Sequence, residues 1–370
     1  MSTAGGLDDG MVKLEPQGLQ DLVTAIFAAI GCSTKEAGRI AAYLVGANLA
    51  GHDSHGVARV PRYVQMHRDG LILADQVVEP VIDTPVMAIL DGKYGFGQTV
   101  APQAVEIGIA KCRAHGLSAV GLRRAGHIGR VGDWAEMAAQ ANLVSMHFVN
   151  AAGSVLVAPF GGVERRFSTA PCCIGIPRPG EDPLILDFAT SVVAEGKALV
   201  ASQGGKRLPA DALVGPDGAV SDDPRLLYGQ EGGHDHSKGS GAIRAFGDHK
   251  GSGLALMCEL IGGALTGNGA TDPAQPRFAN GMFSVYVDPN VIDPESWFPR
   301  EVARYVAFVK SSRPIAPNNE VLVPGEPEAN RRGERQAHGI PLPRATWSGL
   351  LATARAVDLE PGPFEALVQK

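Results

Sequence analysis

The sequence reads Gly51-His52-Asp53-Ser54-His55-Gly56-Val57-Ala58-Arg59 at the end of an amphipathic apolar run, and Tyr63 follows four residues later. A helix that begins near Ser54 would place His55, Arg59 and Tyr63 on one face, because residues four apart stack along a helix. An arginine fork matches a carboxylate, and an imidazole can hold a proton near neutral pH. The stretch therefore predicts a site for a small organic acid. A polar helix start with a solvated His-Arg pair is the alternative interpretation.

Helical patterns surround this stretch. Residues 17–30 carry apolar side chains at a helical period. Ser33-Thr34-Lys35-Glu36 is a capping box that opens a second helix towards Ala50. A third helix is expected over residues 57–68. The first 75 residues are therefore expected to be helical.

From Val77 onwards, strand patterns alternate with helical ones, which predicts an α/β region. The expected strands are 86–90, 117–122, 144–149, 184–186 and 282–287, and the expected helices are 101–113, 133–142 and 250–265. Helical patterns return at 300–310 and 346–356. We therefore expect both termini to form one helical lobe, residues 1–75 with 312–370, around an α/β domain at residues 76–311.

Composition excludes several classes of protein. Hydrophobic residues make up 45% of the chain and charged residues 19%, which is typical of a folded globular protein. The net charge is -6 and the basic residues are scattered, so nucleic acid is not an expected partner. The five cysteines form no CxxC pair, which predicts reduced thiols in a cytoplasmic protein. No secretory signal pattern opens the chain, and no apolar run is long enough to predict a membrane span.

The usual phosphate-binding motifs are absent from the sequence. No GxGxxG follows a predicted strand, and no GxxxxGK[ST] loop occurs. A dinucleotide that binds to this chain must therefore do so without the Rossmann fingerprint.

A histidine between glycines follows one of the predicted strands. Gly126-His127-Ile128-Gly129 lies after strand 117–122 and before the next helix. Ligands gather at the carboxyl ends of strands in α/β sheets, and a loop histidine there can serve as an acid or base. The alternative is a loop histidine that caps the following helix.

Two further junctions could hold an anion. Asp187-Phe188-Ala189-Thr190-Ser191 ends a strand with hydroxyls and backbone N–H groups, which suit a phosphate or a ribose. Lys250-Gly251 opens the apolar helix and offers a cation beside backbone amides. An ordinary N-cap and a capped buried helix are the respective alternatives.

Metal and hydrolase chemistry are not expected. His234-Asp235-His236 resembles a metal-binding fragment, but no third ligand lies near it in the sequence, so it is interpreted as a solvated polar loop. No GxSxG elbow of a serine hydrolase occurs either.

Taken in order, these motifs resemble the type-2 malate/L-lactate dehydrogenase family of non-Rossmann, NAD(P)-dependent 2-hydroxyacid oxidoreductases, and within it the hydroxycarboxylate dehydrogenase B branch. Seven collinear segments carry the resemblance, at residues 50–56, 127–130, 157–161, 187–191, 249–251, 324–326 and 339–342.

The resemblance implies a sulfolactate dehydrogenase-like α/β fold with a mixed sheet, and a homodimer. The helical lobe would form the substrate side and dimer contacts, while residues 76–311 would bind NAD, or alternatively NADP. Small residues let helices approach closely, so the helix that carries Gly262-Gly263 is expected at the dimer interface. His127 would be the acid/base and Arg59 the carboxylate ligand, and Ser54, His55 and Tyr63 would line the pocket. Cofactor contacts would come from Ala151, Asp187, Phe188, Ala189, Thr190, Lys250, Gly251, Pro324 and Gly325.

Three departures from the family pattern bear on the substrate. Gly126 replaces an Asn or His, Asp133 replaces a common Tyr, and Ser168-Thr169-Ala170-Pro171 replaces Gly-Thr-Asn-Pro. Three functions therefore remain open: a reversible 2-hydroxyacid/2-oxoacid oxidoreductase, an NADPH-dependent reductase of cyclic imino acids, and a binding homologue that has lost catalysis. The first is favoured because His127, Arg59 and His55 are all present.

Overall fold

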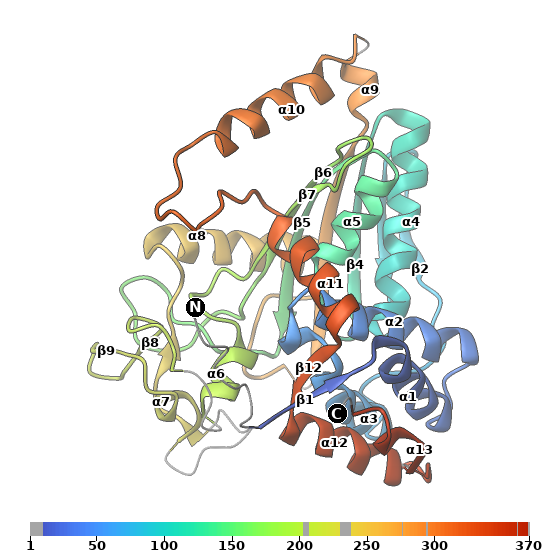
Figure 1. Cartoon of the computed structure of the whole chain (residues 1–370). Coiled ribbons are helices and arrows are strands. Elements are labelled where there is room, and N and C mark those ends of the chain that lie inside the picture. The colour runs from blue at the N-terminus through green and yellow to red at the C-terminus, as the bar shows by residue number, and fades with distance from the viewer. Residues whose placement is uncertain are drawn as a thin grey trace. The chain divides into compact units, whose positions relative to one another are not determined.

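The computed structural model of the chain divides into two compact units (Figure 1). One unit joins Met1–Asp75 to Glu326–Lys370, and the other is Gln76–Gly325. Residues 312–325 were expected in the helical lobe, but the structure groups them with the α/β unit. The residues that the structure describes are 10–202, 207–229, 238–275, 277–293, 295–360 and 362–368.

Helices and one small sheet build the first unit. The expectation that the first 75 residues are entirely helical is wrong, because strand β1 (Met11–Leu14) pairs antiparallel with β12 (Ile340–Pro343). This pairing joins the two ends of the chain within the unit (Figure 1). The helices are α1 (Pro16–Ala29), α2 (Thr34–Leu49), α3 (Val60–Arg68), α11 (Glu326–His338), α12 (Arg344–Arg355) and α13 (Gly362–Glu365).

The predicted capping box at the start of α2 forms only in part. The hydroxyl of Ser33 accepts from Glu36 N at 3.2 Å, as the motif requires. The carboxylate of Glu36, however, accepts from Asp75 N at 2.6 Å. Glu36 therefore connects the start of α2 to Asp75, the last residue of the N-terminal part of this unit.

A seven-stranded mixed sheet is the centre of the second unit, and the expected α/β class is confirmed. Only β3 and β4 are parallel neighbours, and every other neighbouring pair is antiparallel. In spatial order the strands are β2 (Glu79–Asp83), β3 (Met87–Asp91), β4 (Leu117–Ala125), β11 (Ala279–Val287), β5 (Val144–Ala152), β6 (Cys172–Ile176) and β7 (Leu184–Phe188).

Three helices pack on this sheet. Helix α4 (Gly97–His115) contacts β4 and β11, and α5 (Gly132–Gln140) contacts β5, β6 and β7. Helix α8 (His249–Cys258) continues as a π-helical turn, η4 (Glu259–Ala264), which contacts β5 and β11.

The glycine pair in η4 faces its own chain. A Cβ on Gly262 would lie 2.8 Å from Phe148 O, and one on Gly263 would lie 2.5 Å from the amide of Asn150. Both glycines therefore allow η4 to approach β5 closely. The close approach that these glycines allow is within the chain, and a place for this helix at a dimer interface stays a prediction.

The remaining elements of the second unit are short or peripheral. A small sheet with the order β10-β8-β9 surrounds a separate apolar core that includes Leu213, Leu227 and Ile243. These elements are β8 (Leu213–Val214), β9 (Val220–Ser221), β10 (Ala242–Ile243), α6 (Glu195–Ser202), α7 (Arg225–Tyr228), α9 (Pro289–Ile292) and α10 (Trp297–Lys310).

Strand directions bring several loops to one edge of the large sheet. Strands β4, β5 and β7 run in the same direction, since each pair is separated by one antiparallel strand. Their carboxyl ends, Ala125, Ala152 and Phe188, therefore lie at the same edge. Ligands in α/β proteins commonly bind at such an edge.

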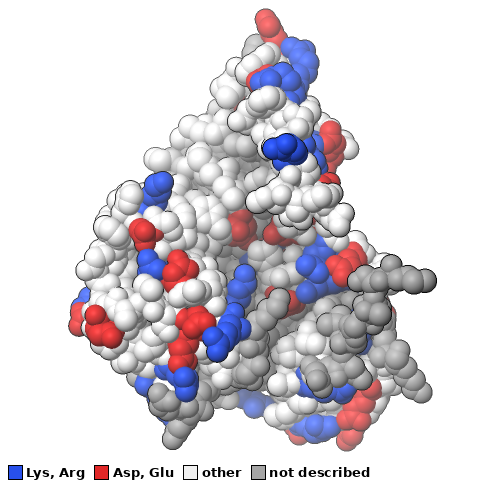
Figure 2. Space-filling view, turned by 60° about the vertical axis from the view of Figure 1, so that its left-hand side comes forward, with Lys and Arg blue, Asp and Glu red and all other residues white. Residues whose placement is uncertain are grey.

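The surface carries charges of both signs close together. On the face shown in Figure 2, basic and acidic side chains are interspersed. Ion pairs between surface residues include Arg244 with Asp248, at 2.7 Å. Among the described residues, no helix combines the length and the hydropathy that crossing a membrane would require.

Candidate active site

The segment from Gly51 to Tyr63 does not form a single helix. It folds as two 3₁₀ turns, η1 (Asp53–His55) and η2 (Val57–Arg59), and α3 begins only at Val60. The expectation that His55 shares a helical face with Arg59 and Tyr63 is therefore wrong, although Arg59 and Tyr63 remain about one turn apart.

Asn48 of α2 explains this break. Its Oδ1 accepts from Val57 N at 2.8 Å. Between the two 3₁₀ turns, Gly56 is extended, and a Cβ on this glycine would lie 2.2 Å from Asn48 Oδ1. The amide of Asn48 thus occupies the space that a side chain at position 56 would need.

Three of the predicted residues lie together in this segment. The hydroxyl of Ser54 lies 3.1 Å from His55 Nδ1. The Nε–H of Arg59 donates to Ser54 O at 2.6 Å, which orients the guanidinium and uses only part of its donor set. Tyr63 is buried. The arrangement brings a hydroxyl, an imidazole and an oriented guanidinium into one cluster.

Helix α11 holds this segment from the opposite end of the chain. The carboxylate of Asp53 accepts from both Nη atoms of Arg335, at 2.6 and 3.0 Å, and from Asn48 Nδ2 at 2.6 Å. His52 Nε2 lies 3.2 Å from Glu328. Sequence reasoning missed Arg335 and Asn48, because α11 has no apolar period and Asn48 lies within a predicted helix.

The loop that carries His127 is fixed on both sides. Gly126 N donates to Gly95 O at 2.8 Å, and Ile128 N donates to Asn280 Oδ1 at 3.0 Å. The His127 side chain between them is half-buried. A ring held by its neighbours yet partly accessible suits a group that transfers protons.

His147 shows the contrast with a structural histidine. Its ring is fully buried in β5, 2.8 Å from Ser284 Oγ and 3.0 Å from Ser145 Oγ. Burial lowers the pKa of His147 to about 3, so the ring is neutral at physiological pH. His147 therefore stabilises the core and is a poor acid or base.

The Asp187–Thr190 junction begins with the last two residues of β7 and contacts the start of α5. Asp187 Oδ2 accepts from Gly132 N at 2.7 Å, at the start of α5. The hydroxyl of Thr190 donates to the carbonyls of Thr169 and Ala170, both at 3.0 Å. The hydroxyl of Thr190 is therefore engaged with residues 169 and 170. We expect the backbone groups of the junction, more than this hydroxyl, to contact the cofactor.

The start of α8 lies against this junction. Phe246 N donates to Thr190 O, and Gly251 N donates to Phe246 O, both at 3.0 Å. A Cβ on Gly251 would lie 2.2 Å from Phe246 O, so only glycine fits there. Lys250 is exposed beside it. The structure thus brings Thr190, Lys250 and Gly251 together, while the ring of Phe188 meets that of Phe246 edge-on at 5.6 Å.

The Pro324-Gly325 turn contacts the edge strand β7, and Ala151 lies within β5. Pro324 O accepts from Ile185 N of β7 at 3.2 Å. Gly325 has φ +96°, a conformation that favours glycine. Ala151 pairs in register with Asn280, the residue that holds the His127 loop. Ile185 lies near the start of β7, so the Pro324-Gly325 turn is at the opposite end of this strand from Phe188. The other predicted residues of the second unit lie at or beside the carboxyl-end edge of the sheet, whereas Ser54, His55, Arg59 and Tyr63 belong to the first unit.

A buried charge cluster lies beside Asp187. Arg130 pairs with Asp133 at 2.8 Å and with Glu136 at 2.9 Å. Burial raises the pKa of Asp133 to about 6, although Arg130 opposes this shift, and the nearby carboxylates of Glu136 and Asp187 add to it. The acid that replaces the family's usual tyrosine thus titrates near neutral pH.

The third departure from the family pattern has a backbone consequence. Ala170 has φ +32° and is fully buried. Asparagine tolerates left-handed backbone better than alanine does. The alanine at this position therefore combines the loss of an amide side chain with a less favourable conformation.

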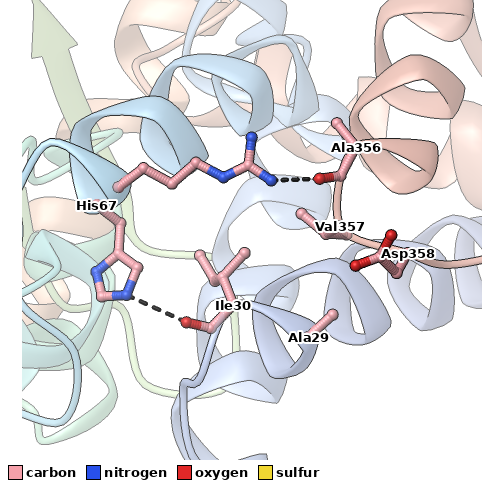
Figure 3. A pocket seen from close by; sticks show the side chains of 7 residues that line it. Ala29, Ile30, His67, Ala356, Val357 and Asp358 are labelled. Carbon is pink, nitrogen blue, oxygen red and sulfur yellow. Dashed lines mark hydrogen bonds between the residues drawn. The ribbon is translucent and has the colours of Figure 1, made fainter.

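A surface pocket in the first unit contains none of the predicted site residues. In Figure 3 the ring of His67 points towards Ile30 O, 3.2 Å away, and the guanidinium of Arg68 donates to Ala356 O. These contacts connect α1, α3 and α12, which indicates a structural role. The pocket is lined by Ala29, Ile30, His67, Arg68, Ala356, Val357 and Asp358.

Within the described part of the chain, no three His, Cys, Asp or Glu side chains gather in a way that could hold a metal ion. His234-Asp235-His236 lies outside the described residues.

Comparison with known proteins gives likenesses over almost the whole chain. The family model for malate/L-lactate dehydrogenase matches residues 14–351. Hydroxycarboxylate dehydrogenase B from Escherichia coli K12 is 35% identical over 363 residues, 97% of this chain and 98% of that protein. A solved malate/lactate dehydrogenase structure from E. coli superposes with a TM-score of 0.89 at 35% identity, covering 96% of this chain and 98% of the other. The Δ1-piperideine-2-carboxylate reductase from Pseudomonas syringae pv. tomato has a TM-score of 0.76 at 28% identity, over 92% and 99% of the two chains.

Proposed function

The chain belongs to the malate/L-lactate dehydrogenase family, and from this premise we propose that it interconverts a 2-hydroxycarboxylate and its 2-oxoacid with NAD or NADP as hydride carrier. The expected sulfolactate dehydrogenase-like fold is confirmed. The observation that best supports the proposal is the placement of His127, Ala151 and the Asp187–Thr190 junction at the edge formed by the carboxyl ends of β4, β5 and β7.

The residues at this edge fit a dinucleotide. The Gly251 position leaves no room for a Cβ, so backbone can approach a phosphate there, and Lys250 supplies a cation at the start of α8. Asp187, Phe188, Ala189 and Thr190 would form the other wall, and Ala151 and the Pro324-Gly325 turn would complete the contacts. When bound, the nicotinamide would accept the hydride from the substrate's C2 or return it.

The chain's own residues would then move the proton and hold the acid. The imidazole of His127 would take the proton of the 2-hydroxyl during oxidation and return it during reduction. The guanidinium of Arg59 would bind the substrate carboxylate in a bidentate manner. Ser54, His55 and Tyr63 would line the pocket around the acid.

Two alternatives remain in the proposal. The likeness to the piperideine carboxylate reductase favours an NADPH-dependent reductase of cyclic imino acids as the second candidate. A binding homologue without catalysis is the third. We further propose that the protein works in the cytoplasm, which the five free, buried cysteines support.

Turnover of a substrate panel tests these proposals. NADH and NADPH oxidation would be followed with 2-oxoacids and with cyclic imines, using wild type, His127→Ala and, as a control on an exposed helix end, His115→Ala. We expect 2-oxoacid reduction by wild type and by the control, and a loss of about 10²–10⁴-fold in kcat for His127→Ala. Reduction of imines alone would support the second candidate, and no turnover would support the third. Unchanged turnover in His127→Ala would remove this histidine from the mechanism.

A further inference from the structure

A buried carboxylate on the π-helical turn η4 has no role in the proposed reaction. Glu259 is only 3% exposed. It accepts five hydrogen bonds from neutral donors: two from Ser168, two from Thr271 and one from Asn150 Nδ2 at 3.1 Å. Such a group is anchored firmly, because every one of these bonds would be lost if the turn moved.

Glu259 and a backbone carbonyl together fix the orientation of Asn150. The Nδ2 of Asn150 donates to Glu259 Oε2 at 3.1 Å and to Gly269 O at 2.8 Å, so its NH₂ end faces both acceptors. The oxygen end of Asn150 then accepts from Asn268 Nδ2 and from Gly281 N, both at 3.2 Å. These contacts fix which atoms of Asn150 donate and which accept.

Two asparagines continue this network to the His127 loop. Asn268 Oδ1 accepts from Arg124 N at 2.8 Å, before His127. Asn280 Nδ2 donates to Asn150 O at 2.7 Å, while its Oδ1 accepts from Ile128 N at 3.0 Å, after His127. The network therefore holds the loop on both sides of the histidine.

A β-bulge in β4 lies just before this loop, opposite Asn280 and Gly281. The register of β11 against β4 shifts between Asn280, opposite Ala125, and Met282, opposite Leu122. Arg123 and Arg124 of β4 therefore lie opposite the single residue Gly281 of β11, and a Cβ on Gly281 would be 2.2 Å from Gly262 O. Bulges re-aim the strand that carries them and are enriched beside active sites. The His127 loop thus leaves β4 just after the bulge, where the amide of Asn280 faces Ile128 N.

We propose that Asn280 is a positioning residue for His127, and that Glu259 and Asn150 support it by fixing the backbone beside it, at Asn150 O and Gly281 N. The inference rests on the proposed role of His127. One buried amide accepts from the loop with its oxygen and donates to β5 with its nitrogen. Removing it leaves Ile128 N and Asn150 O without these partners and lets the loop shift. A displacement of about 1 Å can lower turnover about 10²-fold.

Two substitutions and one control separate positioning from general damage. Asn280→Leu keeps the approximate volume and removes both hydrogen bonds, whereas Asn280→Asp keeps the acceptor and loses the donor. Ser284→Ala is the matched control, because Ser284 is buried on the same strand and its hydroxyl contacts His147 away from the loop. The readouts are kcat, KM, the Kd of NADH, the pH profile, and hydrogen exchange of the Ile128 amide.

Asn280→Leu should lower kcat about 10²-fold, leave the Kd of NADH within about twofold, and speed exchange at Ile128. Ser284→Ala should change neither kcat nor this exchange. Asn280→Asp should be impaired at neutral pH and regain turnover as pH falls, because a protonated carboxyl can accept from Ile128 N and donate to Asn150 O. A purely structural role would not give this acid rescue.

Hydrogen exchange at the Ile128 amide tests the positioning role of Asn280 separately from the catalytic role proposed for His127. Unchanged protection of Ile128 in Asn280→Leu would overturn the inference, whether or not a substrate has been found. Faster exchange with unaltered kcat would also overturn it, as would an equal loss of kcat in Ser284→Ala. Wild-type turnover in His127→Ala, by contrast, would contradict the proposed function itself.

Discussion

The side chain of Arg59, the proposed carboxylate ligand, is oriented by its own segment. Its Nε–H donates to Ser54 O within a pair of 3₁₀ turns, so the plane of the guanidinium is set by the same segment that carries Ser54 and His55. An arginine oriented in advance loses less side-chain entropy when it binds a carboxylate.

Arg59→Lys tests this proposed role. Lysine keeps the positive charge but lacks both the fork and the Nε–H bond to Ser54 O, so kcat/KM for the acid should fall about 10–100-fold. Arg62→Lys, an exposed position on α3, is the control and should change little. Steady-state kinetics on both variants would decide the matter. An unaltered kcat/KM in Arg59→Lys would refute the carboxylate contact.

The pKa of Asp133 predicts a pH-dependent contribution to stability. Burial raises this pKa from 3.8 to about 6, against the opposing effect of Arg130. Below the unfolded value both states are protonated. As pH rises through the folded value, the unfolded state gains relative stability, so this contribution to the free energy of unfolding is lost, by on the order of 3 kcal/mol.

Asp133→Asn removes that dependence. The wild-type free energy of unfolding minus that of the variant should therefore fall between pH 4 and pH 7, because titrating groups outside the Arg130–Asp133–Glu136–Asp187 cluster cancel in the difference. Chemical denaturation of both proteins at several pH values measures it. A difference that stays constant or rises with pH would contradict the assignment.

Only those site residues that carry a local sequence signal could be predicted. Ser54, His55 and Arg59 are close in the sequence, and His127 lies between glycines after a strand. Glu259 and Asn280 lacked such a signal, since each depends on partners more than a hundred residues away. Their contacts follow from the close approach of η4 to β5, which no local pattern contains.

Among the helices, α1 has a local sequence signal and α11 has none. Helix α1 buries an apolar stripe, including Leu19, Leu22 and Ile26, and its period predicts it well. Helix α11 buries only Arg335, so no apolar period could reveal it. Strand β1 is four residues long, and its partner is at the other end of the chain.

Arg335→Met tests how much α11 stabilises the segment before η2. The change leaves Asp53 without its fork and removes the donor to Asn48 O. The side chain of Asp53 is 45% exposed, so water can partly solvate its carboxylate after the ion pair is lost. The free energy of unfolding should therefore fall by about 1–3 kcal/mol. The segment with the proposed ligand Arg59 should loosen at the same time, which should raise KM for the acid.

The same helix offers a control for this prediction. Arg331 pairs with Glu334 on the exposed face of α11. Arg331→Met should therefore lower stability by less than about 0.5 kcal/mol. Urea denaturation compares the two variants, and equal losses would show that the Arg335–Asp53 contact has no special role.

At the scale of the whole molecule, the chain builds its first unit from both ends. The sequence predicted this arrangement through helical patterns at both termini. It could not predict the boundary, because residues 312–325 contain no strong secondary-structure signal, and Pro324 is drawn to β7 by a backbone hydrogen bond. Assigning substrate and dimer contacts to the helical lobe remains a prediction.

Exposed apolar side chains on the second unit favour a dimer, and some of them lie on the helix that was expected at the interface, although on a face other than its glycine pair. Gly262 and Gly263 face β5, whereas Leu256, Met257 and Leu260 are each more than 40% exposed along the same helix. Helix α10 buries only Val306 and exposes Trp297, Tyr305 and Phe308. Apolar patches of this kind commonly mark interfaces between proteins.

Light scattering on wild type and Leu260→Glu tests the predicted homodimer. Wild type should have the mass of two chains, because an obligate interface buries a large apolar area. A charge at Leu260 would be desolvated in that interface, so the variant should dissociate at micromolar concentration and lose activity with it. Val220→Glu, at an exposed position of the small sheet, should remain dimeric. A fully active wild-type monomer would refute the homodimer, and a dimeric Leu260→Glu variant would exclude this face of α8 and η4 as its interface.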